Sequence, residues 1–193
     1  MNSRAILLWG GNVPWKDIKN KISILKRNGI QFVYLVSCGE PGEFETEPGI
    51  VRIHNSIKVA SGVALSRAMN YIQSLNVKER YGFFLIYGDS YIDDRILARV
   101  NQLVTICDVQ PIDMFMVMRL TDKAYSKKYI TDFHGYVTHS RIAIRGNDSL
   151  GIFFLCNRVL QDIVHGGTGK VSEMIDSFCK ENKKIYSIIN GCC

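Results

Sequence analysis

Residues 83–94, FFLIYGDSYIDD, run from five consecutive apolar positions into Gly88 and Asp89. A strand that is apolar at every position is buried on both faces, as in the middle of a parallel sheet. In open α/β sheets the carboxyl ends of such strands face the ligand crevice. We therefore expect Asp89 at the mouth of a crevice, with Gly88 letting a ligand approach the backbone closely.

Strands and helices alternate on both sides of this stretch. Before it, the apolar periodicity predicts strands at 5–9, 30–37 and 50–54, a helix closed by Gly29 and a second helix at 59–75. After it, we predict a helix at 94–107, a strand at 112–120 and a hairpin within 128–146 that turns near His134. A strand at 151–156, a helix at 157–164 capped by Asn157, a helix at 170–183 and a strand at 184–189 complete the chain.

This alternation predicts a single domain over residues 1–193. Its class is α/β, with a three-layer, Rossmann-like, mostly parallel sheet that carries helices on both faces and a small antiparallel hairpin. Within the strand at 112–120 the alternating residues Met114, Met116 and Met118 indicate core packing rather than a cofactor site. The Gly-, Pro- and Glu-rich stretch 38–49 is typical of a solvated loop.

Composition favours an ordinary globular protein with an anionic ligand. The 193 residues are 47% hydrophobic and 22% charged, and the net charge of +6 is compatible with a nucleotide. Basic residues form no run longer than three and no repeat with aromatic residues, so we expect no nucleic-acid partner. No stretch approaches the roughly 18 apolar residues that span a bilayer, and we expect neither a membrane partner nor a signal peptide.

The six cysteines show no metal-binding spacing and indicate thiols in a reduced compartment, so we expect a cytoplasmic protein. The terminal pair Cys192 and Cys193 resembles a lipidation site of small GTPases. Because the chain has no P-loop, we interpret the pair simply as the end of the domain. The stretch HGGTGK at 165–170 is interpreted as a turn rather than a second phosphate loop.

Six segments, in the same order, resemble the sugar-phosphate nucleotidyltransferase family, whose Rossmann-like fold is shared with GT-A glycosyltransferases. They are AILLWGG (5–11), IKNKISILKRNGIQFVYLVS (18–37), KVASGVALSRAMNYI (58–72), FFLIYGDSYID (83–93), KYITDFHGYVTHS (128–140) and SLGIFFLCNRVLQDI (149–163). Each motif alone is only weakly specific for the family, but the occurrence of all six in the same order is a more specific signal. Together the six segments cover nearly the whole chain. The resemblance implies transfer of a nucleotidyl group from a nucleoside triphosphate to a sugar phosphate, with release of pyrophosphate.

The resemblance also implies roles for individual residues. Asp89 would bind a catalytic Mg²⁺, the ion that clamps phosphate oxygens in such reactions. Asp93 and Asp94 could assist through water, although acids are also favoured simply because a helix begins there. The residues expected to bind the nucleotide are Gly10, Gly11, Gly62 and Gly88.

The sequence departs from the family where phosphate-binding cations are expected. The family's long loop with its Arg and Lys is missing after Gly11, and only Lys16 lies near. The family's Glu-Lys-Pro is replaced by AIRGN (143–147), which leaves Arg145, and its Asn-Ala-Gly by SLG, which leaves Ser149 and Gly151 for the sugar phosphate. We expect Lys16 to act in catalysis, with Arg145 or Lys170 as further substitutes for the lost cations. The family's second metal-binding Asp has no counterpart.

Three functions therefore stay open. The first is a compact nucleotidyltransferase that makes a nucleotide sugar. The second is a catalytically inactive domain of the same fold, acting as a regulatory or assembly subunit with itself or another chain. The third is a GT-A glycosyltransferase that uses Asp89 with Mn²⁺ or Mg²⁺ on a nucleotide sugar, although a strict Asp-x-Asp is missing. We favour the first and leave its activity open.

Overall fold

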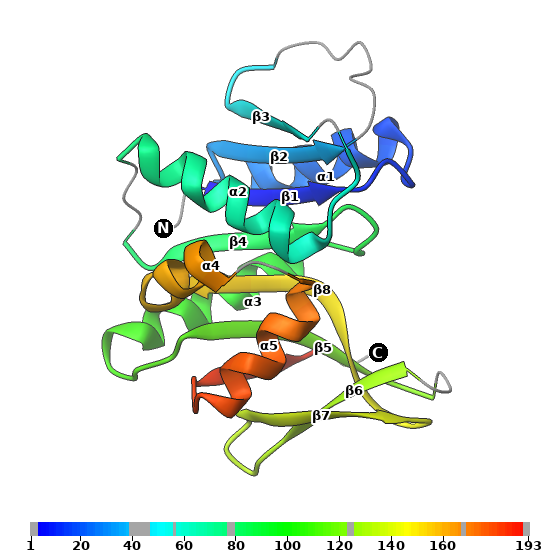
Figure 1. Ribbon diagram of the computed structural model, residues 1–193, viewed down its shortest axis with the longest axis vertical. Helices are drawn as coiled ribbons and strands as arrows, with labels where there is room; N and C mark the ends of the chain where they lie inside the picture. The colour runs from blue at the N-terminus through cyan, green and yellow to red at the C-terminus, as the bar shows by residue number, and fades with distance from the viewer. Residues whose placement is uncertain are drawn as a thin grey trace.

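The computed structural model describes residues 4–38, 47–55, 57–76, 80–122, 126–166 and 169–190. The loop glutamates Glu40, Glu43 and Glu45, residues 167–168 of the HGGTGK stretch, and the terminal Cys192 and Cys193 lie outside these ranges. Within them, a nine-stranded sheet runs through the molecule (Figure 1). Its strands are β1 (Arg4–Trp9), β2 (Phe32–Cys38), β3 (Ile50–Asn55), β4 (Gly82–Tyr87), β5 (Met114–Thr121), β6 (Ser126–Thr131), β7 (Val137–Ala143), β8 (Gly146–Cys156) and β9 (Ile185–Ile189).

The strand order is β3-β2-β1-β4-β8-β5-β9, with the β6–β7 hairpin attached to β8. Strands β3, β2, β1 and β4 are parallel, β8 runs antiparallel between β4 and β5, and β9 is parallel to β5. The predicted mostly parallel sheet with an added antiparallel element is therefore confirmed. The parallel half matters most for the site, because it aligns the carboxyl ends of four strands at one edge.

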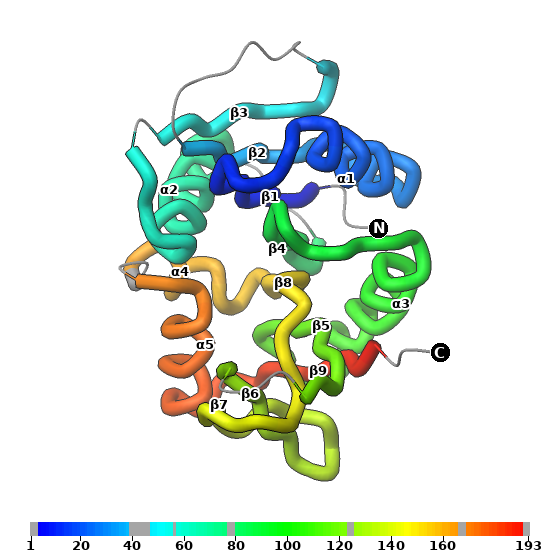
Figure 2. Tube along the Cα trace, turned by 90° about the vertical axis from the view of Figure 1, so that its right-hand side faces the viewer, coloured from blue at the N-terminus to red at the C-terminus, as the bar shows by residue number. Residues whose placement is uncertain are grey.

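Helices cover both faces of the sheet (Figure 2). α2 (Ser61–Ser74), α4 (Leu160–Gly166) and α5 (Val171–Lys180) lie on one face, and α1 (Trp15–Arg27) and α3 (Asp94–Val104) on the other. The side chains of β4 alternate between the two cores: Phe83 and Leu85 pack under α2, whereas Phe84 and Ile86 pack under α1 and α3. This explains why every position of the strand is apolar.

The sequence-based elements agree with the structure except near β8. Asn157 is the first residue of a 3-10 turn (Asn157–Val159) that precedes α4, and Cys156 occupies the N-cap position of this turn. The side-chain amide of Asn157 donates to the carbonyl of Arg80 at 3.0 Å. Strand β8 begins at Gly146 instead of residue 151, because its first part pairs with β5. This added length carries Asp148 and Ser149 toward the candidate site.

The three methionines of β5 are fully buried in the core, as predicted. No helix among the described residues is long and apolar enough to cross a membrane.

Candidate functional site

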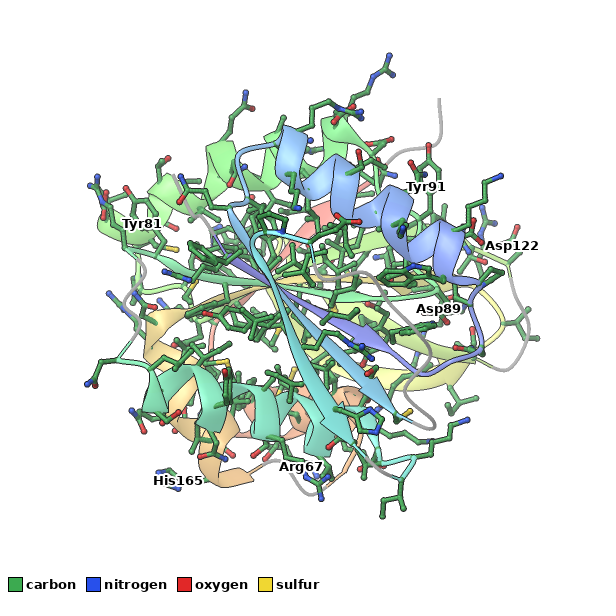
Figure 3. All side chains as sticks on the ribbon, turned by 90° about the horizontal axis from the view of Figure 1, so that it is seen from above. Arg67, Tyr81, Asp89, Tyr91, Asp122 and His165 are labelled. Atoms are coloured by element: carbon green, nitrogen blue, oxygen red, sulfur yellow. The ribbon has the colours of Figure 1, made fainter. Side chains whose placement is uncertain are left out.

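The candidate site lies where the parallel strands end. β1 leads into Gly10, β2 ends at Ser37 and Cys38, β3 ends at Asn55, and β4 leads into Gly88 and Asp89. Because these strands are parallel neighbours, their last residues meet at one edge of the sheet. Figure 3 shows Asp89, which follows β4, at the opposite end of the sheet from Tyr81, which precedes it. The expected placement of Asp89 at a strand tip facing a crevice is found.

Two cavities adjoin at this edge. The first has a volume of about 160 Å³ and is formed by the ends of β1 to β4 and the start of α2. Its walls are largely apolar with a few polar groups, as is usual for a site that binds an organic ligand. It is lined by Leu8, Trp9, Gly10, Asn12, Val36, Ser37, Cys38, Asn55, Val59, Ser61, Ala64, Tyr87, Gly88 and Asp89.

Two residues that line the first cavity carry buried polar groups with no hydrogen-bond partner among the described residues. These groups are the hydroxyl of Ser37 and the side-chain amide nitrogen of Asn55, whose residues are 5% and 4% exposed. The amide oxygen of Asn55 accepts a hydrogen bond of 2.6 Å from Arg67, which fixes the orientation of the amide. Leaving buried polar groups unpaired costs about 1–3 kcal/mol each, so a side-chain rotation that pairs either group with a bound ligand would be favourable.

Tyr87 forms the boundary of the first cavity. Its hydroxyl lies 3.3 Å from the hydroxyl of Ser61, which also accepts a hydrogen bond of 3.1 Å from the backbone of Val171. Burial raises the pKa of the Tyr87 phenol, so this group stays neutral at physiological pH. The tyrosine thus joins the end of β4 to the first turns of α2 and α5.

The second cavity lies on the other side of Asp89. It has a volume of about 390 Å³ and more polar walls. Tyr87 and Asp89 line both cavities, so these two residues lie where the two spaces adjoin. The remaining lining residues are Ser90, Tyr91, Arg119, Asp148, Ser149, Leu150 and Gly151.

A tight turn at Gly151 shapes the wall of the second cavity. Gly151 has φ +70°, and a Cβ atom there would lie 2.4 Å from the hydroxyl oxygen of Ser90. The Ser90 hydroxyl instead donates to the Gly151 carbonyl at 3.0 Å, and the Gly151 amide donates to Ser149 Oγ at 3.0 Å. These contacts hold the start of the buried part of β8 beside the residues that follow β4.

The charges of the second cavity are arranged by strand pairing. Arg119 on β5 lies opposite Asp148 on β8, and its side chain is exposed. The ammonium nitrogen of Lys128, which is fully buried, lies 3.1 Å from Asp148 Oδ2. Because Lys128 offsets the charge of Asp148, Arg119 can present positive charge to an anionic ligand.

Five of the predicted site residues are brought together. Gly10 and Gly88 line the first cavity, Ser149 and Gly151 line the second, and Asp89 lines both. Gly11, which follows Gly10, is exposed and lines neither cavity.

Gly62 requires a correction. It does not line the first cavity, although its neighbours Ser61 and Ala64 do. A Cβ atom at position 62 would lie 2.4 Å from the carbonyl oxygen of Gly169, which accepts a hydrogen bond of 2.9 Å from the Gly62 amide. The absence of a side chain therefore allows α2 to pack against the segment before α5.

The three predicted cations also lie outside both cavities. Lys16 is exposed in the first turn of α1, and Lys170 occupies the N-cap position of α5. Arg145 pairs with Asp122 at 3.2 Å on the surface. None of the three lines either cavity. The sequence could not distinguish these cations from Arg119, because only the pairing of β5 with β8 determines which one faces the site.

Asp93 and Asp94 have local structural roles. Asp93 caps α3 by accepting a hydrogen bond of 2.8 Å from the amide of Ile96. Asp94 forms an ion pair of 2.7 Å with Arg27 and accepts a hydrogen bond of 2.6 Å from Asn28. These contacts hold the pKa of the Asp94 carboxyl below its usual value. Both acids act at the start of α3, and neither lines the cavities.

Sequence reasoning missed four residues. Ser37, Asn55 and Arg119 line the cavities, and the first two could have been found as polar residues at the ends of apolar strands. The fourth is Lys21 on α1. Burial lowers the pKa of Lys21, whereas the negative charges of Asp17 and Asp89 act in the opposite direction, so Lys21 lies within electrostatic range of Asp89.

Comparison with known proteins identifies the fold. No model of a known protein family matches the sequence, and no curated protein matches it. Among solved structures, CMP:2-keto-3-deoxy-manno-octonic acid synthetase complexed with CTP matches with a TM-score of 0.67 and 13% identity, over 98% of this chain and 90% of that one. CTP:phosphocholine cytidylyltransferase from Streptococcus pneumoniae matches with a TM-score of 0.68 and 12% identity, over 100% and 91%. The chain therefore shares the fold of these two proteins over nearly its whole length.

Proposed function

We propose that this chain is a nucleotidyltransferase. It transfers a nucleotidyl group from a nucleoside triphosphate to the phosphate of a small acceptor, and pyrophosphate leaves. The observation that carries the proposal is the junction of two cavities at Asp89. A reaction between two phosphate-bearing molecules needs two adjoining binding sites with the reacting phosphates between them.

The first cavity suits the nucleoside of the donor. Its apolar walls can pack against a base, and the polar side chains of Ser37 and Asn55 could reach the base edge or ribose after a rotation that exposes their buried polar atoms. The exposed backbone at Gly10 adjoins the same space and can approach the phosphates, whereas the amide of the buried Gly88 already donates to the Leu8 carbonyl at 2.7 Å. CTP is the nucleotide named for both solved structures, which makes a pyrimidine triphosphate the first donor to test.

The second cavity suits the acceptor. Arg119 can bind the acceptor phosphate, and Asp148, Ser149 and the ring of Tyr91 can contact the rest of the molecule. A sugar phosphate is the acceptor that the sequence resemblance implies, and these polar walls could bind one. Phosphocholine, named for one of the solved structures, is a second phosphomonoester to test.

In the reaction, an oxygen of the acceptor phosphate attacks the α-phosphorus of the triphosphate. A new P–O bond forms and the bond between the α- and β-phosphates breaks. Two anions must meet, so positive charge is the main requirement for catalysis. Arg119 would offset the charge of the acceptor, and Lys21 would offset charge near Asp89.

Asp89 is the residue that fits Mg²⁺. Its side chain is exposed in the space that the donor and acceptor phosphates would share. No group of three or more His, Cys, Asp or Glu residues is gathered for a metal in the described part of the chain. Mg²⁺ is commonly held by one or two carboxylates together with substrate phosphates, so a single Asp is sufficient as an anchor. When bound, Mg²⁺ would neutralise phosphate oxygens.

The direct test is pyrophosphate release from paired substrates. We expect release only when a nucleoside triphosphate and a phosphomonoester are both present with Mg²⁺. Asp89→Asn should lower the rate by about a hundredfold or more. Asp122→Asn is the matched control, because Asp122 is an exposed acid whose only described partner is Arg145 on the surface. Equal rates in the two variants would refute the role of Asp89.

One observation favours a second function, nucleotide binding without turnover. Among the described residues that line the first cavity, none is Lys or Arg. A protein of this fold without these cations could bind a nucleotide as a regulatory subunit. Thermal stabilisation by a nucleoside triphosphate, with no pyrophosphate from any acceptor, would favour this function over the transferase.

A further inference from the structure

Two cysteines far from the candidate site lie side by side. The sulfur of Cys107 is 3.4 Å from the sulfur of Cys156, although 49 positions separate the residues. Cys107 lies in the 3-10 turn η1 (Thr105–Asp108) that follows α3, and Cys156 is the last residue of β8. Both are free thiols in the structure.

The pair combines an accessible thiol with a protected one. Cys107 is partly exposed, whereas Cys156 is only 2% exposed and packs in the core between the sheet, α1 and α3. The hydrogen bond between the thiols lowers the pKa of Cys107, and the nearby charge of Arg158 acts in the same direction. The hydrogen bond and burial raise the pKa of Cys156. A thiol with these properties at position 107 is the better nucleophile of the two.

The geometry permits a disulfide. The sulfurs of a disulfide lie about 2.0 Å apart, so these two must approach by roughly 1.4 Å. Cys107 lies in a short turn rather than in the sheet, so it can move while Cys156 stays paired to Gly82 of β4.

We propose that Cys107 and Cys156 form a peroxide-oxidisable dithiol site. The sulfur of Cys107 attacks hydrogen peroxide, forming an S–O bond and breaking the O–O bond, and the first water leaves. The sulfur of Cys156 then attacks the sulfenic acid of Cys107, forming the S–S bond and breaking the S–O bond, and the second water leaves. Two thiols are thereby oxidised to one disulfide, and one peroxide is reduced to two waters.

The site is independent of the proposed nucleotidyl transfer. Cys156 lies at the end of β8 that is away from Ser149 and Gly151, and neither cysteine lines the two cavities. Oxidation would tie the end of α3 to the end of β8. A thiol pair that closes only on oxidation is the kind of disulfide found in redox-sensing proteins of reducing compartments.

The test uses the full chain with Cys192 and Cys193 replaced by Ser, so that Cys38, Cys107, Cys156 and Cys179 are the remaining thiols. After treatment with hydrogen peroxide, we expect the loss of two titratable thiols per chain. Mass spectrometry of a non-reduced digest should show the Cys107 peptide joined to the Cys156 peptide. Dithiothreitol should restore both thiols.

Two variants test the order of the steps. In Cys156→Ala, oxidation should stop at a sulfenic acid on Cys107, which dimedone traps, whereas the parent should give the disulfide and little trapped product. Cys179→Ser is the matched control, because Cys179 is a partly buried thiol on α5, and its oxidation pattern should match the parent. A disulfide that joins other cysteines, or peroxide oxidation of Cys179 before Cys107, would overturn the proposal.

Discussion

At the scale of the residue, we propose Lys21, in place of the predicted Lys16, as the cation that acts on the charge at Asp89. Neither lysine lines a cavity, but the charge of Asp89 acts on the pKa of the partly buried Lys21, whereas Lys16 is exposed in the first turn of α1. We expect Lys21→Ala to lower the rate of pyrophosphate release by about tenfold or more, because it removes a positive charge that would stabilise the reacting phosphates. Lys16→Ala is the matched control and should keep the parent rate. The opposite result, with Lys16→Ala as the impaired variant, would restore the sequence-based assignment.

Asp94 offers a test by pH. Its carboxyl has a lowered pKa in the folded chain, so the folded state binds fewer protons than the unfolded state between the two pKa values. The stability it contributes is therefore complete above the unfolded pKa and is lost as the pH falls through the folded pKa. We expect Asp94→Asn to lower the urea midpoint at neutral pH and to match the parent in strong acid.

Asp122→Asn is the control for that measurement. The pair of Asp122 with Arg145 is about three-quarters exposed on both sides, so its loss should change the midpoint little at any pH. A deficit of Asp94→Asn that is the same at every pH would show that the carboxylate charge is not responsible.

At the scale of the element, a substitution at Gly62 tests how tightly α2 packs against the segment before α5. Alanine normally stabilises a helix by about 1 kcal/mol relative to glycine. Here the added Cβ would lie 2.4 Å from a backbone carbonyl, so the backbone must move. We expect the clash to outweigh the helix propensity, and Gly62→Ala to lower the free energy of unfolding by about 1–2 kcal/mol.

Gly10→Ala is the comparison for Gly62→Ala. A Cβ atom at position 10 would meet Asn12 Oδ1 at 3.4 Å, an ordinary contact, so its stability should stay within about 0.5 kcal/mol of the parent. Chemical denaturation of both variants gives the comparison. If Gly62→Ala were as stable as Gly10→Ala, the close packing at Gly169 would be wrong.

The elements could be predicted because their causes are local. The continuous apolar run of β4 needs a core on each face, and Gly29 ends α1 as predicted; its φ is +85°.

The site was predictable only where a residue directly follows the end of a strand, as Asp89 does. Arg119 and Arg145 are both on or next to strands, and only the register of β5 with β8 brings the first of them beside Asp148. Tertiary pairing of this kind leaves no local pattern in the sequence.

At the scale of the whole molecule, the two cavities should divide the substrates between them. Asn55→Ala removes a polar group from the first cavity and should raise the KM for the triphosphate several-fold, with little change in the KM for the acceptor. Arg119→Ala removes the cation of the second cavity and should raise the KM for the acceptor phosphate about tenfold or more. If both variants raised the same KM, the separation of donor and acceptor would be wrong.

The position of a bound nucleotide tests the proposed site most directly. We would determine a crystal structure of the chain with Mg²⁺ and a CTP analogue whose α–β bridge cannot be cleaved. We expect the base beside Ser37 and Asn55, the α-phosphate beside Asp89, and the space lined by Arg119 left free for the acceptor. A nucleotide bound elsewhere, such as in the cavity between β7 and α5 lined by His139 and Asp176, would contradict the proposed function.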